Sequence, residues 1–233
     1  MPERYQKLRE EVCAANLELQ KQGLVIHSWG NVSGITGENG VVAIKPSGLS
    51  YDDLTPEKMV LLDLEGRVLE GELRPSSDTP AHLELYRNFE GIGGVCHTHS
   101  TYATMWAQAC REIPCYGTTH ADNYHGPVPV TDVMEENEVK HDYEVNTGKV
   151  IVRRFADLNP LLQPAVLVAN HGPFTWGASP AQAVENAVVL EQVARMAFGT
   201  LLINPAQEPI SNSLLDKHFL RKHGKNAYYG QKG

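Results

Sequence analysis

The order in which short apolar segments and helical patterns follow one another is the feature that most limits the fold of this chain. Several segments rich in Val, Ile and Leu have the length of short strands: LVIHSWGNVS, VVAIKPSG, MVLLDLEGRVLEG, VIV and AVLVAN. A turn at Glu65 and Gly66 divides the third segment into a hairpin. These strand pairs mix with helices and lack the regular βαβ rhythm of a parallel sheet. We therefore predict an α/β fold with layers around a central, mostly antiparallel sheet.

Helices can also be predicted from local sequence patterns. Apolar residues recur at steps of four, three and four from Leu8 to Leu19, which predicts a helix over residues 3–22 that ends at Gly23. Thr79 and Pro80 are suitable N-cap and N1 residues for a second helix that runs to Phe89. Ser179 and Pro180 predict in the same way a long helix to about Phe198, and a last short helix is predicted over residues 213–223.

Length and composition predict one soluble globular domain over residues 1–233. Hydrophobic residues make up 42% of the chain, and the net charge of -8 argues against nucleic acid or an anionic membrane as partner, since both bind a basic face. The N-terminus is charged and no apolar run approaches the roughly 18 residues of a membrane span, so we expect a cytoplasmic protein. The cysteines lack CxxC spacing and are expected to be reduced and mostly buried: Cys13, Cys96, Cys110 and Cys115.

Two histidines one residue apart follow a short apolar run in GGVCHTHS. Strand side chains alternate between faces, so an extended Val95–His99 would place His97 and His99 on the same side. His171 in NHGPFTWG ends another apolar strand before a glycine turn. Three neutral imidazoles with room for water or substrate are what a catalytic divalent site requires, with zinc the first candidate and manganese the second. The alternative for each histidine is ordinary hydrogen bonding, solvent exposure or strand capping.

Asp78 in RPSSDTP begins the helix ahead of HTHS, where its carboxylate either completes a metal shell or only favours the helix dipole. Ser76 and Ser77 add hydroxyls to a helix start whose N–H groups can bind an anion. Asn31, Lys45 and Ser47 lie in glycine-containing turns. Backbone amides and a cation can approach a phosphate in such turns, although each turn by itself is more often only a turn.

The second half of the chain offers candidates for proton transfer. Asp122, beside His120 in GTTHADNYHG, is either an acid or base or a solvated loop carboxylate. Tyr228 and Tyr229 are either packing anchors or a phenolic acid. GIGGV precedes a strand instead of opening a helix, so it does not predict a dinucleotide site. A short helix, whose ordinary role is a solvated basic face, carries His218, Arg221 and Lys222.

Several motifs occur along the chain in one order: WGNVSG, IKPSG, SSDTP, HTHS, GTTHAD, HGPFTWG and LLDKHFLRKHGKNAYYGQ. In this order they resemble the L-ribulose-5-phosphate 4-epimerases of the class II aldolase and epimerase superfamily, and the resemblance covers essentially the whole chain. It implies a three-layer α/β/α fold and a homotetramer with fourfold symmetry whose active sites lie at subunit interfaces.

The resemblance also implies roles for individual residues. Zinc, or manganese or another divalent ion, would be bound by Asp78, His97, His99 and His171. Asp122 and Tyr229 match the two acid/base positions. Phosphate contacts would fall to Asn31, Lys45, Ser47, Gly48, Ser76 and Ser77. Supporting positions of the site are matched by Thr118, Glu144, His218 and Arg221.

The reaction that the resemblance implies is epimerisation of L-ribulose 5-phosphate to D-xylulose 5-phosphate at C4, by metal-dependent cleavage and re-formation of the C3–C4 bond. Related aldolases such as L-fuculose-phosphate aldolase typically have a glutamate where this chain has Asp78. Three alternatives stay open: an aldolase that releases its aldehyde, a Schiff-base mechanism through Lys45, and a metal- or sugar-phosphate-binding module without turnover.

Overall fold

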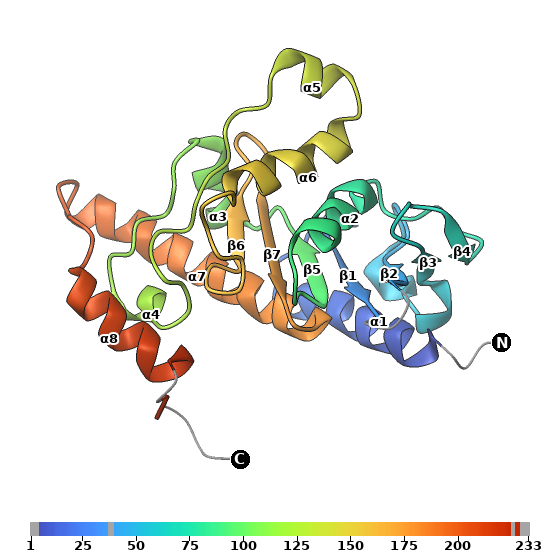
Figure 1. Cartoon of the computed structure of the whole chain (residues 1–233), viewed down its shortest axis with the longest axis horizontal. Helices are drawn as coiled ribbons and strands as arrows, with labels where there is room; N and C mark the ends of the chain where they lie inside the picture. Colours follow the sequence, from blue (N-terminus) through green and yellow to red (C-terminus); the bar gives the residue numbers. More distant parts are fainter. Residues whose placement is uncertain (1–4, 37–39, 225–226, 229–233) are drawn as a thin grey trace.

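The structure, a computed structural model, describes residues 5–36, 40–224 and 227–228, and within them one seven-stranded sheet forms the centre of the molecule (Figure 1). The strands are β1 (Asn31–Ile35), β2 (Val42–Ile44), β3 (Val60–Leu62), β4 (Val68–Glu70), β5 (Gly94–His97), β6 (Ala165–Leu167) and β7 (Pro173–Gly177). They lie in the order β4-β3-β2-β1-β5-β7-β6, and each neighbouring pair is antiparallel. The predicted antiparallel sheet is confirmed.

Helices cover both faces of this sheet. The longer ones are α1 (Gln6–Lys21), α2 (Thr79–Asn88), α3 (Thr101–Gln108), α6 (Tyr143–Arg154), α7 (Pro180–Ile203) and α8 (Asn212–His223), and the short ones are α4 (Thr118–Ala121), α5 (Glu136–Lys140), η2 (Tyr51–Asp53) and η3 (Pro56–Lys58). Buried side chains of α2 and α6 pack on one face, and those of α1, α3 and α7 pack on the other. The predicted α/β fold is therefore confirmed, and Figure 1 shows its layers.

Alternation along β5 serves both faces of the sheet. Val95 is buried in the apolar cluster under α2 and α6, whereas Cys96 is buried in the cluster under α1 and α7. His97 comes two residues after Val95 and therefore points to the α2 and α6 side. Of the cysteines, Cys110 is exposed and the other three are buried, and all four are free thiols, as expected.

One predicted strand is wrong, because Val150–Val152 belongs to α6. Thr147, Val150 and Ile151 are buried, and this spacing of three and four residues is that of a helix. Three apolar residues have no period of their own, so the VIV run alone could not distinguish the two structures.

Strand boundaries near the sheet centre also differ from prediction. Of LVIHSWGNVS, only the part from Asn31 onward is a strand, because Gly30 adopts a φ of +83° and ends the preceding loop. A Cβ at Gly30 would lie 2.9 Å from the carbonyl oxygen of His97, so the site also requires its small size. β5 ends at His97, two residues earlier than predicted, and β7 lies in HGPFTWG, which the sequence indicated only as a turn.

The starts of α2, α7 and α8 agree with prediction to within a residue. α1 begins at Gln6, whereas the helix was predicted from residue 3, and residues 3 and 4 lie outside the described residues. Ser179 is the N-cap of α7, where its hydroxyl accepts from the Gln182 amide at 3.2 Å. α2 begins at Thr79 itself, so Asp78 occupies the N-cap position, and Asp78 makes no side-chain capping bond.

By length and composition alone, α7 is apolar enough to cross a membrane. In the structure it packs along β5, β7, α1 and α3 and supplies Leu190, Val193 and Ala194 to the core. We therefore interpret α7 as a core helix.

Candidate active site

The register of the central strands determines which side chains surround His97. β1 pairs with β5 so that Asn31 lies opposite His97, and β7 pairs from the other side so that Phe174 lies opposite it. The Phe174 ring stacks on the His97 imidazole with ring centroids 4.2 Å apart. Neighbours from two strands therefore hold His97 in one orientation at the end of β5.

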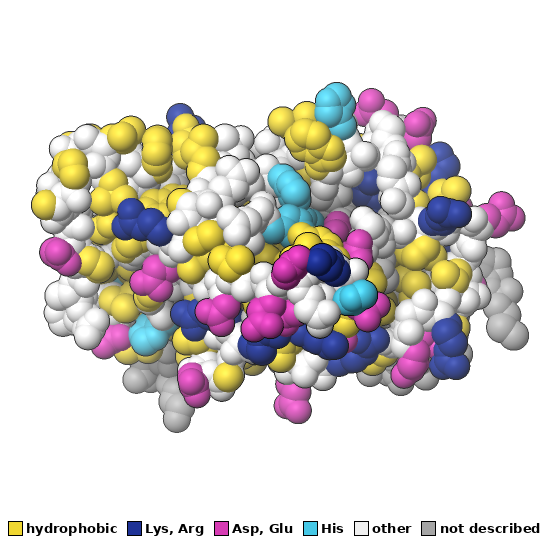
Figure 2. All heavy atoms as spheres, turned by 90° about the horizontal axis from the view of Figure 1, so that it is seen from above, with side chains coloured by type: hydrophobic (Ala, Val, Ile, Leu, Met, Phe, Trp, Pro, Cys, Tyr) yellow, Lys and Arg dark blue, Asp and Glu magenta, His cyan; other side chains and the backbone are white. Residues whose placement is uncertain are grey.

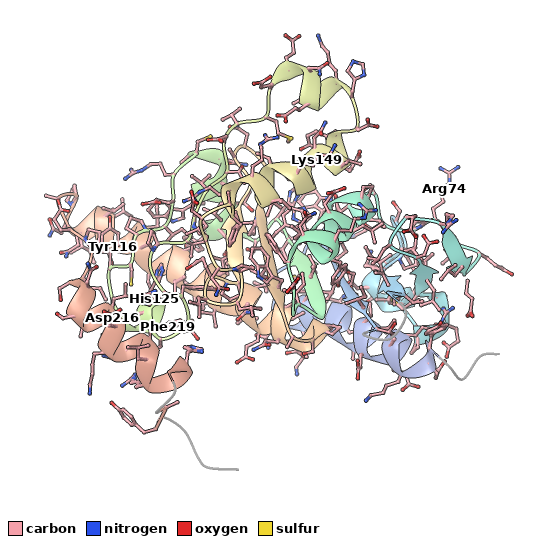
Figure 3. All side chains as sticks on the ribbon, in the orientation of Figure 1. Arg74, Tyr116, His125, Lys149, Asp216 and Phe219 are labelled. Atoms are coloured by element: carbon pink, nitrogen blue, oxygen red, sulfur yellow. The ribbon has the colours of Figure 1, made fainter. Side chains whose placement is uncertain are left out.

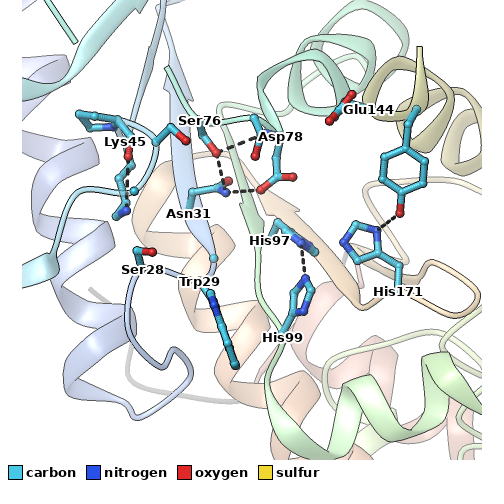
Figure 4. Close-up of a pocket in the computed structure, with 16 residues that line it drawn as sticks. Ser28, Trp29, Asn31, Lys45, Ser76, Asp78, His97, His99, Glu144 and His171 are labelled. Atoms are coloured by element: carbon cyan, nitrogen blue, oxygen red, sulfur yellow. Dashed lines mark hydrogen bonds between the residues drawn. The ribbon is translucent and has the colours of Figure 1, made fainter. Parts of the chain in front are cut away.

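His97, His99 and His171 converge, and each offers a ring nitrogen within 4.8 Å of the others (Figure 4). Nε2 of His97 and Nε2 of His99 are 3.1 Å apart. Two nitrogens bound to one tetrahedral zinc ion at about 2.0–2.1 Å would be about 3.3 Å apart, so this pair has the spacing of two ligands of a single ion. Histidine side chains gather near the middle of the face that Figure 2 shows.

The environment favours imidazoles that keep a lone pair. Burial lowers the pKa of His171 to about 3, and the neighbouring His97 and His99 act in the same direction. Burial, followed by the nearby His97, also lowers the pKa of His99 below its usual value. Both side chains are therefore neutral at pH 7, as metal ligation requires.

The tautomer of His97 follows from its backbone partner. Its Nδ1 lies 2.9 Å from the carbonyl oxygen of Pro173, and because a carbonyl only accepts, Nδ1 carries the proton. Nε2 of His97 then keeps its lone pair on the side of the other histidines. A set of three such imidazoles, with a carboxylate close by, is a donor set that zinc accepts, and manganese is the next candidate.

Asp78 lies in the same pocket and is held by Asn31. The Asn31 amide Nδ2 donates to Asp78 Oδ2 at 2.6 Å and to Ser76 Oγ at 3.0 Å. Burial alone would raise the pKa of Asp78, but His97, His82 and the Asn31 hydrogen bond outweigh it and lower the pKa, so the carboxylate is ionised. Asp78 is not one of the three residues whose ligand atoms converge, so its role as a further metal ligand stays a prediction.

The residues predicted to bind phosphate line the same pocket as the three histidines. The cavity has a volume of about 500 Å³, and we call it the histidine pocket; its lining includes Asn31, Lys45, Ser47, Gly48, Ser76, Ser77, Asp78, His97, His99, Glu144 and His171. Lys45 is only 2% exposed, and its Nζ lies 4.9 Å from the centroid of the Tyr51 ring. Burial lowers the pKa of Lys45. Since no ion pair of Lys45 occurs within the described part of the chain, a phosphate would supply the missing opposite charge.

The histidine pocket also contains side chains that sequence reasoning missed. Ser28, Trp29 and Tyr143 line it, and Trp29 is 55% exposed. The Tyr143 hydroxyl lies 3.3 Å from Nδ1 of His171. Trp29 opens the motif WGNVSG and Tyr143 precedes the predicted Glu144, so proximity in sequence was the one signal that pointed to these two.

A second group of predicted residues meets away from the histidine pocket, and we call Asp122, His218, Arg221 and Lys222 the α4–α8 cluster. Asp122 accepts hydrogen bonds from Nε and Nη2 of Arg221 at 3.1 and 2.8 Å, and from Nδ1 of His218 at 3.0 Å. Burial alone would raise the pKa of Asp122, but the hydrogen bonds from Arg221 and His218 and the charge of Lys222 lower it. None of these residues lines the histidine pocket.

The α4–α8 cluster lies at one end of the molecule, where α4 and α8 are side by side (Figure 1). A further contact ties α8 to this end, since Nε2 of His125 lies 2.9 Å from Oδ1 of Asp216 (Figure 3). Thr118 is the first residue of α4 and also lies outside the lining of the histidine pocket. Tyr229 lies outside the described residues, whereas Tyr228 is exposed with its ring 5.6 Å from Nζ of Lys217.

Comparison with known proteins gives a family match over most of the chain. Residues 10–198 match the model of the class II aldolase and adducin N-terminal domain. The chain is 53% identical over 227 residues to the L-ribulose-5-phosphate 4-epimerase UlaF of Salmonella paratyphi B, a match that covers 97% of this chain and 100% of that protein. The corresponding protein of Salmonella typhi is also 53% identical over the same length.

Solved structures agree on the fold. An L-fuculose 1-phosphate aldolase superposes with a TM-score of 0.77 at 24% identity, covering 91% of this chain and 94% of that chain. YgbL of Klebsiella pneumoniae, described as a putative aldolase/epimerase/decarboxylase, superposes with a TM-score of 0.73 at 26% identity and covers 91% of this chain and 97% of its own.

Proposed function

Because the chain belongs to the class II aldolase and adducin N-terminal domain family and, within it, to the L-ribulose-5-phosphate 4-epimerases, we propose that it is an isomerase that converts L-ribulose 5-phosphate into D-xylulose 5-phosphate. The observation that carries the proposal is the convergence of His97, His99 and His171 in one cavity with the buried cation of Lys45. This arrangement suits a substrate with a ketone at one end and a phosphate at the other. We further propose that the enzyme works in the cytoplasm.

The proposed metal ligands are His97, His99 and His171, with Asp78 beside them. Zinc is the proposed ion, and manganese is the alternative. When bound, such an ion acts as a Lewis acid that polarises the C2 ketone and stabilises the negative charge that develops beside it.

The C4 hydrogen of the substrate has no acidifying group next to it, so we propose that the C3–C4 bond breaks instead. A base takes the proton of the C4 hydroxyl, C4 becomes an aldehyde, and the bonding electrons stay on C3 beside the ketone. Lys45, Ser47 and Gly48 retain the phosphate of the glycolaldehyde phosphate fragment while its aldehyde group rotates. C3 then attacks the other face of the aldehyde, and an acid returns a proton to the new C4 oxygen.

Asp122 and Tyr229 are the proposed base and acid. An epimerase that inverts a hydroxyl-bearing carbon needs one group on each face, because the hydroxyl points oppositely in the two epimers. Arg221 and His218 lower the pKa of Asp122, so at neutral pH its carboxylate is in the ionised form that can accept a proton, although the same partners make it a weaker base. A phenol donates more readily than it accepts, given its reference pKa near 10.

The separation of Asp122 from the histidine pocket supports a site shared between subunits. We propose a homotetramer in which the α4–α8 cluster of one chain completes the histidine pocket of its neighbour. Apolar side chains on α3 and the C-terminal half of α7 support an interface there, because they are exposed in the single chain: Met105, Met196, Phe198, Leu202 and Ile203.

The test is incubation of the purified protein with L-ribulose 5-phosphate that carries deuterium at C4. D-xylulose 5-phosphate should form without an added nicotinamide and should keep the label, because the hydrogen stays on the aldehyde carbon during cleavage. A chelator should abolish turnover, and zinc should restore it.

Each other outcome identifies a different mechanism. Loss of the C4 label to solvent would exclude bond cleavage even if the product is right. Release of glycolaldehyde phosphate and dihydroxyacetone as end products would make the protein an aldolase. Turnover that survives a chelator but is destroyed by borohydride would indicate a Schiff base on Lys45. Absence of any reaction would leave a binding module.

A further inference from the structure

We propose that Tyr143 is a positioning residue of the metal centre: its phenolic oxygen accepts the Nδ1 proton of His171 and holds that imidazole in the tautomer that offers Nε2 to the cation. The inference rests on the metal site proposed above and is independent of which sugar phosphate is turned over. Tyr143 lies in none of the motifs that carry the family resemblance.

The contact between the two side chains is direct. The Tyr143 hydroxyl lies 3.3 Å from Nδ1 of His171, and the two rings are inclined by 30° with centroids 6.1 Å apart. Figure 4 marks this hydrogen bond beside His171. Nδ1 of His171 is thus occupied by the phenol, and Nε2 is the nitrogen left for a cation.

The direction of this hydrogen bond depends on the metal. A neutral imidazole has one N–H and one lone pair, and a phenol can either donate or accept. Without a cation, the Tyr143 hydroxyl can donate to Nδ1 or accept from it. Once Nε2 of His171 gives its lone pair to a cation, the proton must sit on Nδ1, so the ring donates and the phenol accepts. The phenolic hydrogen is then available to another acceptor.

His97 shows the contrasting arrangement. Its Nδ1 faces the carbonyl oxygen of Pro173, which can only accept, so its tautomer is fixed with or without a metal. His171 instead depends on a side chain that can switch roles. A substitution at Tyr143 should therefore weaken the binding of a cation by His171. The partner of His97 is a backbone carbonyl, so a side-chain substitution leaves it in place.

The position of Tyr143 is set by close helix packing. Tyr143 is the first residue of α6, and α6 rests on α2 at Gly148, where an added Cβ would lie 2.5 Å from Cβ of Glu84 and 3.0 Å from the carbonyl oxygen of Ala81. Since α2 follows directly after Asp78, one rigid helix pair carries both Asp78 and Tyr143 to the histidine pocket. A residue held in this way is suited to orient a ligand.

The first experiment compares metal affinity in the metal-free full-length protein and in Tyr143→Phe, by competition for zinc with a chromophoric chelator. We expect affinity to fall by about 10- to 100-fold in Tyr143→Phe, the range typical for loss of a partner that orients a metal ligand. Tyr102→Phe is the matched control, because it removes a phenol whose ring packs near Phe198 and Arg195 on α7, and it should bind zinc like the wild type.

The second measurement uses the wild-type protein, so it does not depend on how a variant folds. In the zinc-loaded protein, ¹⁵N spectra of histidine side chains should show His171 protonated at Nδ1 and metal-bound at Nε2. Metal bound at Nδ1 of His171, or equal zinc affinity in wild type and in a folded Tyr143→Phe, would overturn the inference about Tyr143 alone. A wild-type protein that binds no divalent ion would overturn the metal site of the proposed function as well.

Discussion

The histidine pocket and the α4–α8 cluster differ in what each still lacks. In the histidine pocket, His97 and His171 have nitrogens directed at a shared point, and Lys45 is buried without an ion-pair partner within the described part of the chain. In the α4–α8 cluster, Asp122 already has Arg221 and His218 as partners. The first region is organised to receive a ligand, and the second is organised to keep one carboxylate charged and oriented.

This difference indicates that, in a single chain, the proposed binding region and the proposed proton-transfer region lie in separate places. A pocket of about 500 Å³ can hold a pentose phosphate, but no acid/base candidate of the α4–α8 cluster lines it. The two functions would meet only if a second copy of the chain supplied one of them. The predictions below test that separation, beginning with the largest expected effect.

Replacing His97 with asparagine should disable the histidine pocket. We expect turnover to fall by about 1,000-fold or more, because the Lewis-acid contribution of a metal is worth several kcal/mol. Metal content, measured by elemental analysis, should fall together with activity. His141→Asn is the matched control, since His141 is an exposed residue next to α5. Full metal occupancy in His97→Asn would contradict the ligand assignment.

Replacing Asp122 with asparagine should affect proton transfer and leave the metal in place. We expect turnover to fall by about 100-fold or more with unchanged zinc content, in the range found for loss of a general acid or base. A joint fall in metal content and activity would show that the two regions are not separate.

The sharpest test of the comparison mixes these two variants. In a refolded 1:1 mixture of the two variants, about a quarter of the sites should combine the intact histidine pocket of an Asp122→Asn chain with the intact α4–α8 cluster of a His97→Asn chain, if sites are shared between subunits. Activity should then rise well above that of either variant alone. A mixture that stays as inactive as its components would place both halves of the site in one chain.

Replacing Arg221 with lysine should loosen the α4–α8 cluster without removing its charge. Arg221 holds both carboxylate oxygens of Asp122, and lysine cannot reproduce that paired geometry. We expect a fall in turnover of about tenfold, with unchanged zinc affinity. Arg153→Lys is the matched control, because Arg153 pairs with Glu138 at the molecular surface. Normal turnover in Arg221→Lys would show that the orientation of Asp122 does not limit the reaction.

The last prediction concerns acid stability near α4 and not turnover. Burial lowers the pKa of His120 to about 4, against about 6.5 in an unfolded chain. Below pH 6.5 the unfolded state binds a proton that the folded state does not, so His120 should reduce stability by about 1.4 kcal/mol per pH unit as pH falls from 6.5 to 4. Urea unfolding of wild type and His120→Gln between these pH values should show a flatter dependence in the variant. Parallel curves would contradict the role of His120.

Much of the histidine pocket could be predicted because its residues follow sharp local signals. His97 and His99 end an apolar run, His171 precedes a glycine turn, and Lys45 lies in a turn of its own. The resemblance to a family added the prediction that these separate motifs form one site, which no single motif can indicate by itself. Ser28 and Tyr143 were missed, because neither stands at a strand end or in a pattern typical of a ligand.

The errors in the fold have a similar physical origin. Val150–Val152 was predicted as a strand since β-branched residues favour strands, but burial on one side of α6 decided the outcome. β7 was missed because Gly172 and Pro173 indicate a turn, and the pairing of Phe174 with His97 depends on a strand 77 positions away in the sequence. The location of Asp122 outside the histidine pocket also depends on tertiary structure alone.

The hydrogen bond between His97 and Pro173 has a consequence for protein synthesis. It joins residues 76 positions apart and forms only when β7 has paired with β5. A ribosome-bound chain that ends before Pro173 therefore contains both histidines of HTHS but lacks the acceptor that fixes the tautomer of His97, and His171 has only just been added. Contacts of such long range form slowly. If the three histidines bind a cation as proposed, the complete ligand set can therefore form only after most of the chain has been translated.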